Sequence, residues 1–155
     1  MALAAPHPVG GRDYPRTLRE LNEWFPDDAA CAAYLARLRW PSGFRCLACG
    51  ATKAWWLSEG RFRCAGCRRK TSVTAGTIFA DTHLPLKTWF AACWYVTSQK
   101  PGVSALGLQR VLGLGSYESA WSLLHKLRRA MARPGRDLLS GEVEVDESYV
   151  GGSIP

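Results

Sequence analysis

The sequence lacks any long hydrophobic run. A helix that crosses a bilayer needs about 20 consecutive apolar residues, and the longest apolar cluster here, WFAACWYV, is far shorter. The opening stretch MALAAPHPVGGRDYP also lacks the basic start and apolar core of a secretory signal peptide. The sequence therefore predicts a cytoplasmic protein with no membrane partner.

Cysteine and acidic residues are both sparse. Six cysteines in 155 residues lie well below the density of small secreted domains that depend on disulfides. The 13 Asp and Glu residues stand against 20 Lys and Arg, which gives a formal net charge of +7. This excess suits a polyanionic partner such as nucleic acid, although a basic protein can also be simply soluble and basic.

The chain is long enough for one ordinary domain or for two or three small ones. Thr17 and Glu20 spell a helix capping box, and Asp27 or Asp28 can cap a second helix. Composition and turn signals predict a small multi-module α+β protein. Its parts are a flexible start (1–16), a helical segment (17–43), a cysteine segment (44–82), a helical region (83–133), and a linker with the start of a further domain (134–155).

Four of the cysteines carry the strongest signal. They form two Cys-x-x-Cys pairs, Cys46 with Cys49 and Cys64 with Cys67, separated by fourteen residues. Each pair places two thiolates on one side of a tight turn, so two facing turns can hold a structural zinc ion in a tetrahedral site. The other two cysteines, Cys31 and Cys93, have apolar neighbours and are expected to be inert core thiols.

The residues around these pairs predict a zinc ribbon. AWWL, RFRC and KTSVT are typical of three short strands. The first two lie between the cysteine pairs, joined by the turn SEG, and the third follows the second pair. Gly50 suits the left-handed backbone that often closes a Cys-x-x-Cys turn. Because Arg68 stands at the matching position of the second turn, we expect that turn to close differently, with the help of Gly66.

Other interpretations of the cysteine pairs stay open. Two disulfides would need an oxidising compartment, which nothing in the sequence indicates. An iron site uses similar turns, but a basic collar is more typical of a module that faces phosphates, and we expect the collar to contact DNA. A purely structural zinc module without DNA contacts is a further alternative. The collar comprises Arg45, Lys53, Arg61, Arg63, Arg68, Arg69 and Lys70.

The 83–133 region predicts three helices in helix-turn-helix order, KTWFAACWYVTSQ, ALGLQRVLGL and YESAWSLLHKLRRAM, with Gly113 ending the second. A plain three-helix bundle with a solvated basic face is the alternative. On the last helix we predict a buried stripe of Ala120, Leu123, Leu124, Leu127, Ala130 and Met131. The opposite, DNA-facing stripe comprises Ser122, His125, Lys126, Arg129 and Arg133.

Four longer strings resemble a known family. RWPSGFRCLACG, FRCAGCRRKTSVTAGTIFADTHLPLKTWF, SALGLQRVLGLGSYESAWSLLHKLRRAM and GEVEVDESYVGG occur in the order seen in zinc-ribbon transposases of bacterial insertion sequences, over roughly residues 17–152. The resemblance implies that the ribbon and the helical region bind the duplex DNA of transposon ends. It also implies an RNase H-like catalytic domain of the DDE type that uses two Mg²⁺ ions, in which Asp146 matches the first metal-binding acid.

The closing strand bears on catalysis. Val143 and Val145 alternate with Glu142, Glu144 and Asp146. A two-metal site needs several carboxylates around ions about 3.5–4 Å apart. Acids on the same face of one strand are about 6.6 Å apart, which is too far to enclose such a site without other elements. We therefore expect the truncated DNA-binding part of a transposase, unable to cleave DNA alone, which can associate with full-length transposase or with itself. A stand-alone DNA-binding protein and a zinc-ribbon transcription or RNA-binding module are the alternatives.

Overall fold

The computed structural model describes residues 8–57 and 60–132, and these residues form helices and one small sheet. The predicted first strand of an RNase H-like domain, within 134–155, lies outside the described residues. No helix in the described part is long and apolar enough to cross a membrane. The elements are α1 (Leu18–Trp24), α2 (Asp28–Arg39), β1 (Ala54–Leu57), β2 (Arg61–Cys64), β3 (Lys70–Ser72), α3 (Leu86–Ser98), α4 (Ala105–Leu112) and α5 (Tyr117–Met131).

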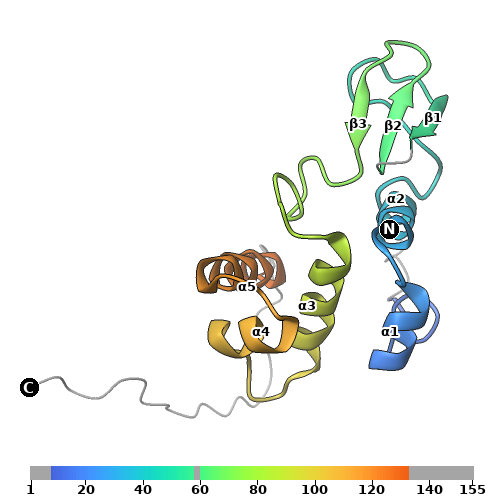
Figure 1. The fold of residues 1–155 in the computed structure, drawn as a ribbon. Coiled ribbons are helices and arrows are strands. Elements are labelled where there is room, and N and C mark those ends of the chain that lie inside the picture. Colours follow the sequence, from blue (N-terminus) through green and yellow to red (C-terminus); the bar gives the residue numbers. More distant parts are fainter. Residues whose placement is uncertain (1–7, 58–59, 133–155) are drawn as a thin grey trace, which may run out of the picture.

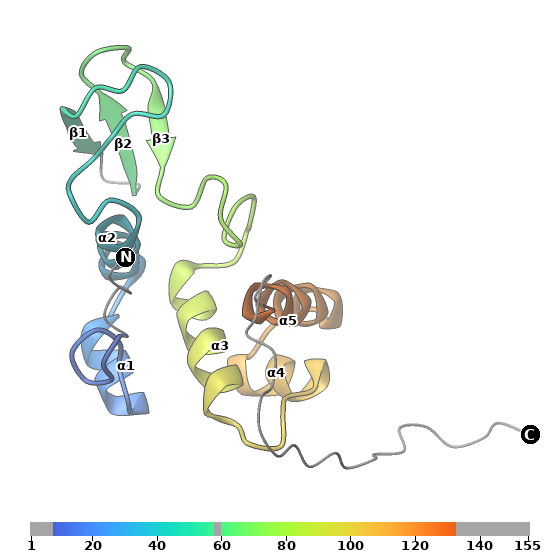
Figure 2. The ribbon, with the colours of Figure 1, turned by 180° about the vertical axis from the view of Figure 1, so that it is seen from behind.

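The elements fall into three neighbouring groups. The antiparallel sheet, in the order β1-β2-β3, stands at one end of the molecule with α2 and then α1 below it (Figure 1). Seen from behind, α3 lies between the α1–α2 pair and the α4–α5 pair (Figure 2). This arrangement agrees with the predicted α+β class and with the predicted order of strands and helices.

Side-chain caps set the starts of the first two helices. Thr17 Oγ1 accepts a hydrogen bond from the Glu20 N–H at 3.1 Å, and Asp27 Oδ1 accepts one from the Ala30 N–H at 2.8 Å. Such caps satisfy N–H groups that have no partner inside the helix. The Glu20 carboxylate accepts from the Arg16 N–H at 2.7 Å, one residue before the cap, so the predicted capping box is completed with a one-residue offset.

Asp28 joins the N-terminal helices to α3. Its Oδ1 accepts a hydrogen bond from the Lys87 N–H in the first turn of α3 at 2.9 Å. In return, Lys87 Nζ donates to the Pro26 carbonyl at 2.8 Å. The residue at the N-cap of α3 is Pro85, which offers no side-chain acceptor. A carboxylate from another helix therefore supplies the cap that the local sequence of α3 lacks.

Apolar side chains fill the contact between α1, α2 and α3. The rings of Phe25 and Phe90 pack edge to face with centroids 4.5 Å apart, and Leu21 and Cys31 are buried beside them. Cys31 has no exposed surface, as expected for a core thiol. Burial raises the pKa of this thiol to about 12, so it stays protonated at neutral pH.

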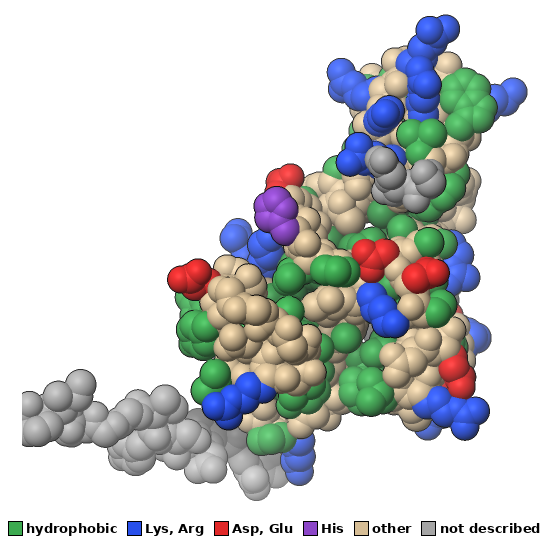
Figure 3. Space-filling view, in the orientation of Figure 1, with side chains coloured by type: hydrophobic (Ala, Val, Ile, Leu, Met, Phe, Trp, Pro, Cys, Tyr) green, Lys and Arg blue, Asp and Glu red, His purple; other side chains and the backbone are tan. Residues whose placement is uncertain are grey.

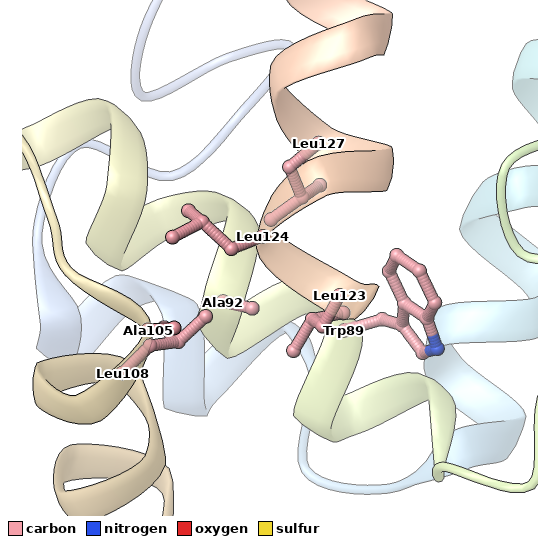
Figure 4. Close-up of a cluster of buried hydrophobic side chains, with 7 residues drawn as sticks. All are labelled: Trp89, Ala92, Ala105, Leu108, Leu123, Leu124 and Leu127. Atoms are coloured by element: carbon pink, nitrogen blue, oxygen red, sulfur yellow. The ribbon is translucent and has the colours of Figure 1, made fainter. Parts of the chain in front are cut away.

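A second core lies where α3, α4 and α5 meet (Figure 4). It consists of Trp89, Ala92, Ala105, Leu108, Leu123, Leu124 and Leu127. The predicted buried stripe of α5 is correct up to Leu127 and wrong for Ala130 and Met131, which are exposed. The core cluster ends at Leu127, so the last turn of α5 extends past the helices that cover it.

Candidate zinc centre and nucleic-acid interface

The four paired cysteines converge on one point. Their sulfur atoms all lie within 4.8 Å of one another. The Cys46–Cys67 and Cys49–Cys64 Sγ distances are 3.7 and 3.5 Å. A tetrahedral zinc site with Zn–S bonds of about 2.3 Å requires sulfurs about 3.8 Å apart, whereas a disulfide requires about 2.05 Å. The spacing therefore suits a structural metal with four thiolate ligands and does not fit the disulfide alternative.

The two cysteine turns are closed by the same backbone hydrogen bond and have a left-handed residue at the same position. In each turn the carbonyl of the first cysteine accepts a hydrogen bond from the N–H four residues later, at 2.9 Å from Gly50 and 3.0 Å from Arg68. Both donors have left-handed backbone, with φ of 73° and 57°. The prediction that the second turn closes differently is wrong, because these backbone bonds impose the left-handed conformation on an arginine as well.

Gly66 has a different role from the predicted one. A Cβ at this position would lie 3.2 Å from the Ala51 Cβ and 3.4 Å from the Cys49 Sγ. A side chain here would therefore make tight contacts where the second turn approaches the first. This glycine permits the close packing of the two turns around the sulfurs, and it does not supply the left-handed position.

The pKa values of the clustered cysteines differ widely because their sulfurs lie so close together. Backbone N–H groups, first that of Ala48 and then that of Cys49, lower the pKa of Cys46 to about 6. The Ala51 N–H acts in the same direction on Cys49, but the neighbouring sulfurs, first that of Cys64, raise the pKa of Cys49 to about 11 overall. Four thiolates at this separation repel one another, and a divalent metal ion removes that repulsion.

One face of the sheet packs on an aromatic cluster that anchors the ribbon to α2. The Phe62 ring stacks on Phe44 with centroids 5.0 Å apart. Trp40, directly after α2, meets Phe62 edge to face at 5.0 Å, and Trp56 does so at 4.8 Å. These rings lie next to the buried sulfurs of Cys46 and Cys64 in the same apolar cluster, so burial of one sheet face supports the metal-binding turns.

The other face of the sheet is open and carries cations. Strand pairing places Arg63 directly opposite Trp55 on one side and Lys70 on the other. Because side chains alternate between faces along a strand, Arg61 shares this face with Arg63. All four side chains are exposed. Lys and Arg side chains gather around this end of the molecule (Figure 3).

The basic charge of the protein is concentrated in this region. Between residues 29 and 80 the sequence has nine Lys and Arg residues and a single acid, Glu59. The formal net charge of this segment is therefore 9 − 1 = +8, which exceeds the +7 of the whole chain. The ion pairs of the described residues are Arg12–Asp13 and Arg19–Glu23, both far from the sheet in sequence. Neither pair involves the exposed ribbon cations Arg45, Lys53, Arg63, Arg68, Arg69 and Lys70.

The predicted polar stripe of α5 is exposed and borders the core, because the Lys126 Nζ lies 5.7 Å from the centroid of the Trp89 ring. Ser122, His125, Lys126 and Arg129 are all exposed, and Arg133 lies outside the described residues. The neighbouring Arg128 has a structural role, because it donates a hydrogen bond to the Val103 carbonyl at 2.9 Å. The structure does not bring the two predicted contact groups together: the sheet stands at one end of the molecule and α5 lies beyond α3 (Figures 1 and 2).

The sequence indicates Trp55 and Trp56 as a pair beside the basic collar that could stack on a base, but two aromatic arrangements were missed. Trp55 and Trp56 lie on opposite faces of the sheet, which strand alternation could have indicated. On α5 the Trp121 ring packs against the His125 ring with centroids 3.9 Å apart. Their spacing of four residues is the available signal, because such residues are neighbours on a helix.

Comparison with known proteins identifies the cysteine-bearing segment. Residues 26–70, which include all four clustered cysteines, match the family described as transposase zinc-ribbon domain. The chain carries a transposase zinc-ribbon domain. This match confirms the resemblance to zinc-ribbon transposases expected from the sequence.

A relative of the chain comes from Halobacterium salinarum. The chain is 28% identical over 132 residues to an uncharacterized protein in transposable element ISH50 of Halobacterium salinarum. The aligned part covers 81% of this chain and 43% of the relative, so the chain spans less than half the length of that protein. No solved structure matches the chain significantly.

Proposed function

We propose that this chain is the DNA-binding part of an insertion-element transposase, organised by one zinc ion. The observation that carries the proposal is the open sheet face, which carries the exposed side chains of Arg61, Arg63 and Lys70. This face belongs to a segment with nine cations and one acid, within a domain that matches transposase zinc ribbons. Exposed Lys and Arg side chains gathered on one surface form the electrostatic footprint of a phosphate-binding site.

The zinc ion has a structural role in this proposal. Cys46, Cys49, Cys64 and Cys67 would supply all four ligands, which leaves no open position for a substrate. Free thiols for this purpose fit the reduced, cytoplasmic setting that the sequence predicts. The metal keeps the two turns together and thereby fixes the strands that present the cations.

The ribbon and α5 would contact DNA in different ways. Cations on a flat sheet, together with Arg45, Arg68 and Arg69 around the turns, would bind phosphates and position the protein. In α4 and α5 the connection closes at Gly113, which has left-handed backbone with φ of 63°. A helix in this position can enter a major groove, where Ser122, His125, Lys126 and Arg129 would reach base edges.

DNA strand transfer would require an acidic metal site in addition to the DNA-binding surfaces. Asp146, which the resemblance matches to the first Mg²⁺-binding acid, lies outside the described residues and stays a prediction. A two-metal site needs further carboxylates around it. The DNA-binding proposal depends on the ribbon and on α5 and is independent of that site.

A salt titration of duplex binding tests the proposal. The fluorescence anisotropy of a labelled duplex that carries the element's terminal repeat would be measured with the zinc-loaded chain, beside a scrambled duplex. The logarithm of the association constant should fall linearly with the logarithm of the salt concentration, by about 0.9 per phosphate contact. Arg63→Glu should weaken binding and lower this slope by about one contact.

The control for that titration is a matched charge reversal on a distant helix. Arg19 is exposed on α1 and pairs with Glu23, so Arg19→Glu should leave both affinity and slope close to those of the natural chain. An affinity that does not depend on salt, or an equal loss in the two variants, would contradict the proposed interface. Equal binding of the terminal and scrambled duplexes would contradict sequence-specific recognition.

A further inference from the structure

We propose that Trp55 is a stacking platform for an unpaired base of single-stranded DNA, with Arg63 and Lys70 as its phosphate-binding neighbours. This inference rests on the proposed DNA-binding function and extends it from duplex to single-stranded DNA. The ribbon would then hold a strand whose bases are exposed, in addition to contacting the phosphates of a duplex.

The two adjacent tryptophans of β1 have different environments. Trp56 pairs across the sheet with Phe62, and their rings meet edge to face at 4.8 Å. Trp55 points to the other face, is 56% exposed, and has no ring contact among the described residues. A single exposed apolar side chain is common on protein surfaces, so the case for a ligand depends on what surrounds this one.

The surroundings are cations at regular spacing. Arg63 lies directly opposite Trp55 on the neighbouring strand, and Lys70 lies opposite Arg63 on the next. With strands about 4.8 Å apart, the backbone positions of Arg63 and Lys70 lie about 5 and 10 Å from that of Trp55, and the three side chains share one face. Neither Arg63 nor Lys70 has an ion pair among the described residues. A strand of DNA that crosses the sheet can therefore place phosphates over the cations while one base covers the indole.

An exposed indole beside two cations favours single-stranded DNA as the ligand over a duplex or an acidic protein. In a duplex the base faces are stacked on one another and cannot contact an indole on a flat surface. An acidic peptide would pair with the cations but would leave the ring of Trp55 without a flat apolar partner. An aromatic platform within a basic groove is the arrangement by which proteins bind single strands with little sequence preference.

Variants at Trp55 test the platform. We expect Trp55→Ala to weaken binding to oligo(dT) by about 5- to 150-fold, the range for loss of one base–aromatic stack. Duplex affinity should change less than about twofold, and Trp55→Phe, which keeps a ring, should retain most of the oligo(dT) affinity. The matched control is Leu47→Ala, because Leu47 is an apolar ribbon residue that is 81% exposed on the first cysteine turn. Its removal should leave both affinities unchanged.

A second measurement avoids variants that could perturb folding. The natural chain would be photo-crosslinked to an oligo(dT) that contains 5-iodouracil, and the attached peptide would be mapped. Crosslinking at Trp55 supports the platform, and crosslinking only on α5 or elsewhere overturns it. An oligo(dT) affinity that is insensitive to Trp55→Ala, or an equal loss on duplex and single strand, overturns it as well.

The same data separate this inference from the proposed function. If the chain binds duplex DNA but Trp55→Ala does not change its affinity for oligo(dT), the platform alone is refuted. Absence of binding to both DNA forms refutes the platform together with the proposed function. Tighter, Trp55-dependent binding to oligo(rU) than to oligo(dT) would overturn the assignment of DNA as the ligand.

Discussion

Gly50 and Arg68 occupy equivalent positions in the two cysteine turns and share a left-handed backbone, with φ of 73° and 57°. This conformation carries no steric cost for glycine, whereas a residue with a Cβ pays about 1–2 kcal/mol. Both residues donate the hydrogen bond that closes their turn. The arginine is therefore held in a strained backbone while its exposed side chain remains available at the surface.

Replacing Arg68 by glycine should separate its charge from its backbone role. The variant loses about 1–2 kcal/mol of steric strain but gains about 0.5–1 kcal/mol of backbone entropy in the unfolded chain. Arg68→Gly should thus unfold with an unchanged or slightly increased free energy in chemical denaturation of the zinc-loaded protein, and bind duplex DNA more weakly. Gly50→Ala, the converse change, should cost about 1 kcal/mol. Loss of zinc in Arg68→Gly would mean that the arginine itself supports the site.

Leu108 should be a principal determinant of helical stability. It is fully buried between α3, α4 and α5, so Leu108→Ala should lower the free energy of unfolding by about 2–5 kcal/mol. Leu106 lies on the same helix but is 46% exposed, and Leu106→Ala should cost far less. Denaturant titrations of the two variants make the comparison. Similar losses would contradict the observed packing of α4.

Metal removal should expose some cysteines and leave others unreactive. With a chelator at neutral pH, a thiol reagent should modify the four clustered cysteines rapidly. Burial raises the pKa of Cys31 to about 12 and that of Cys93 to about 11, from a usual value of 9.0. Both should react only after unfolding, because the thiolate is the nucleophile. Rapid modification of Cys31 in the native chain, or equal reactivity with and without zinc, would contradict this.

The same two pKa values predict how stability depends on pH. Above pH 9 an unfolded thiol loses its proton, while the native Cys31 and Cys93 thiols keep theirs until about pH 12 and 11. The unfolded state then binds fewer protons than the native state, so the free energy of unfolding should fall as the pH rises through this window. Cys93→Ala should reduce the fall when unfolding is monitored by helical circular dichroism. An unchanged pH dependence would argue against a native Cys93 thiol with a raised pKa.

The cysteine centre and the strands could be predicted from the sequence because their determinants are local. The spacing of the Cys-x-x-Cys pairs, the apolar run AWWL and the alternation in RFRC depend on few neighbouring residues. The role of Gly66 could not be predicted, because it depends on Ala51 and on the sulfur of Cys49 from the other turn. The same holds for Met131: periodicity places it on the apolar face of α5, but only the tertiary structure shows where the covering helices end.

Two adjacent arginines on α5 should have separable effects. Arg129 is exposed opposite the core, and Arg129→Ala should weaken duplex binding and reduce the salt slope by about 0.9 without loss of stability. Arg128 donates to the Val103 carbonyl, so Arg128→Ala should cost about 1 kcal/mol of stability. Anisotropy and thermal melting of both variants test the distinction. A reversed pattern would mean that α5 presents a different face to DNA.

The metal dependence of DNA binding tests the central claim most directly. The affinity of the zinc-loaded chain for the terminal-repeat duplex would be compared at fixed salt with that of the chelator-treated chain, before and after zinc is restored. Structural zinc in small sites contributes about 10–16 kcal/mol of apparent binding free energy that is coupled to folding. Without the metal, the sheet that holds Arg63 and Lys70 on one face should therefore be lost. We predict that affinity falls at least tenfold on chelation and returns with zinc. Equal affinity of the two forms would contradict a zinc-organised DNA-binding ribbon.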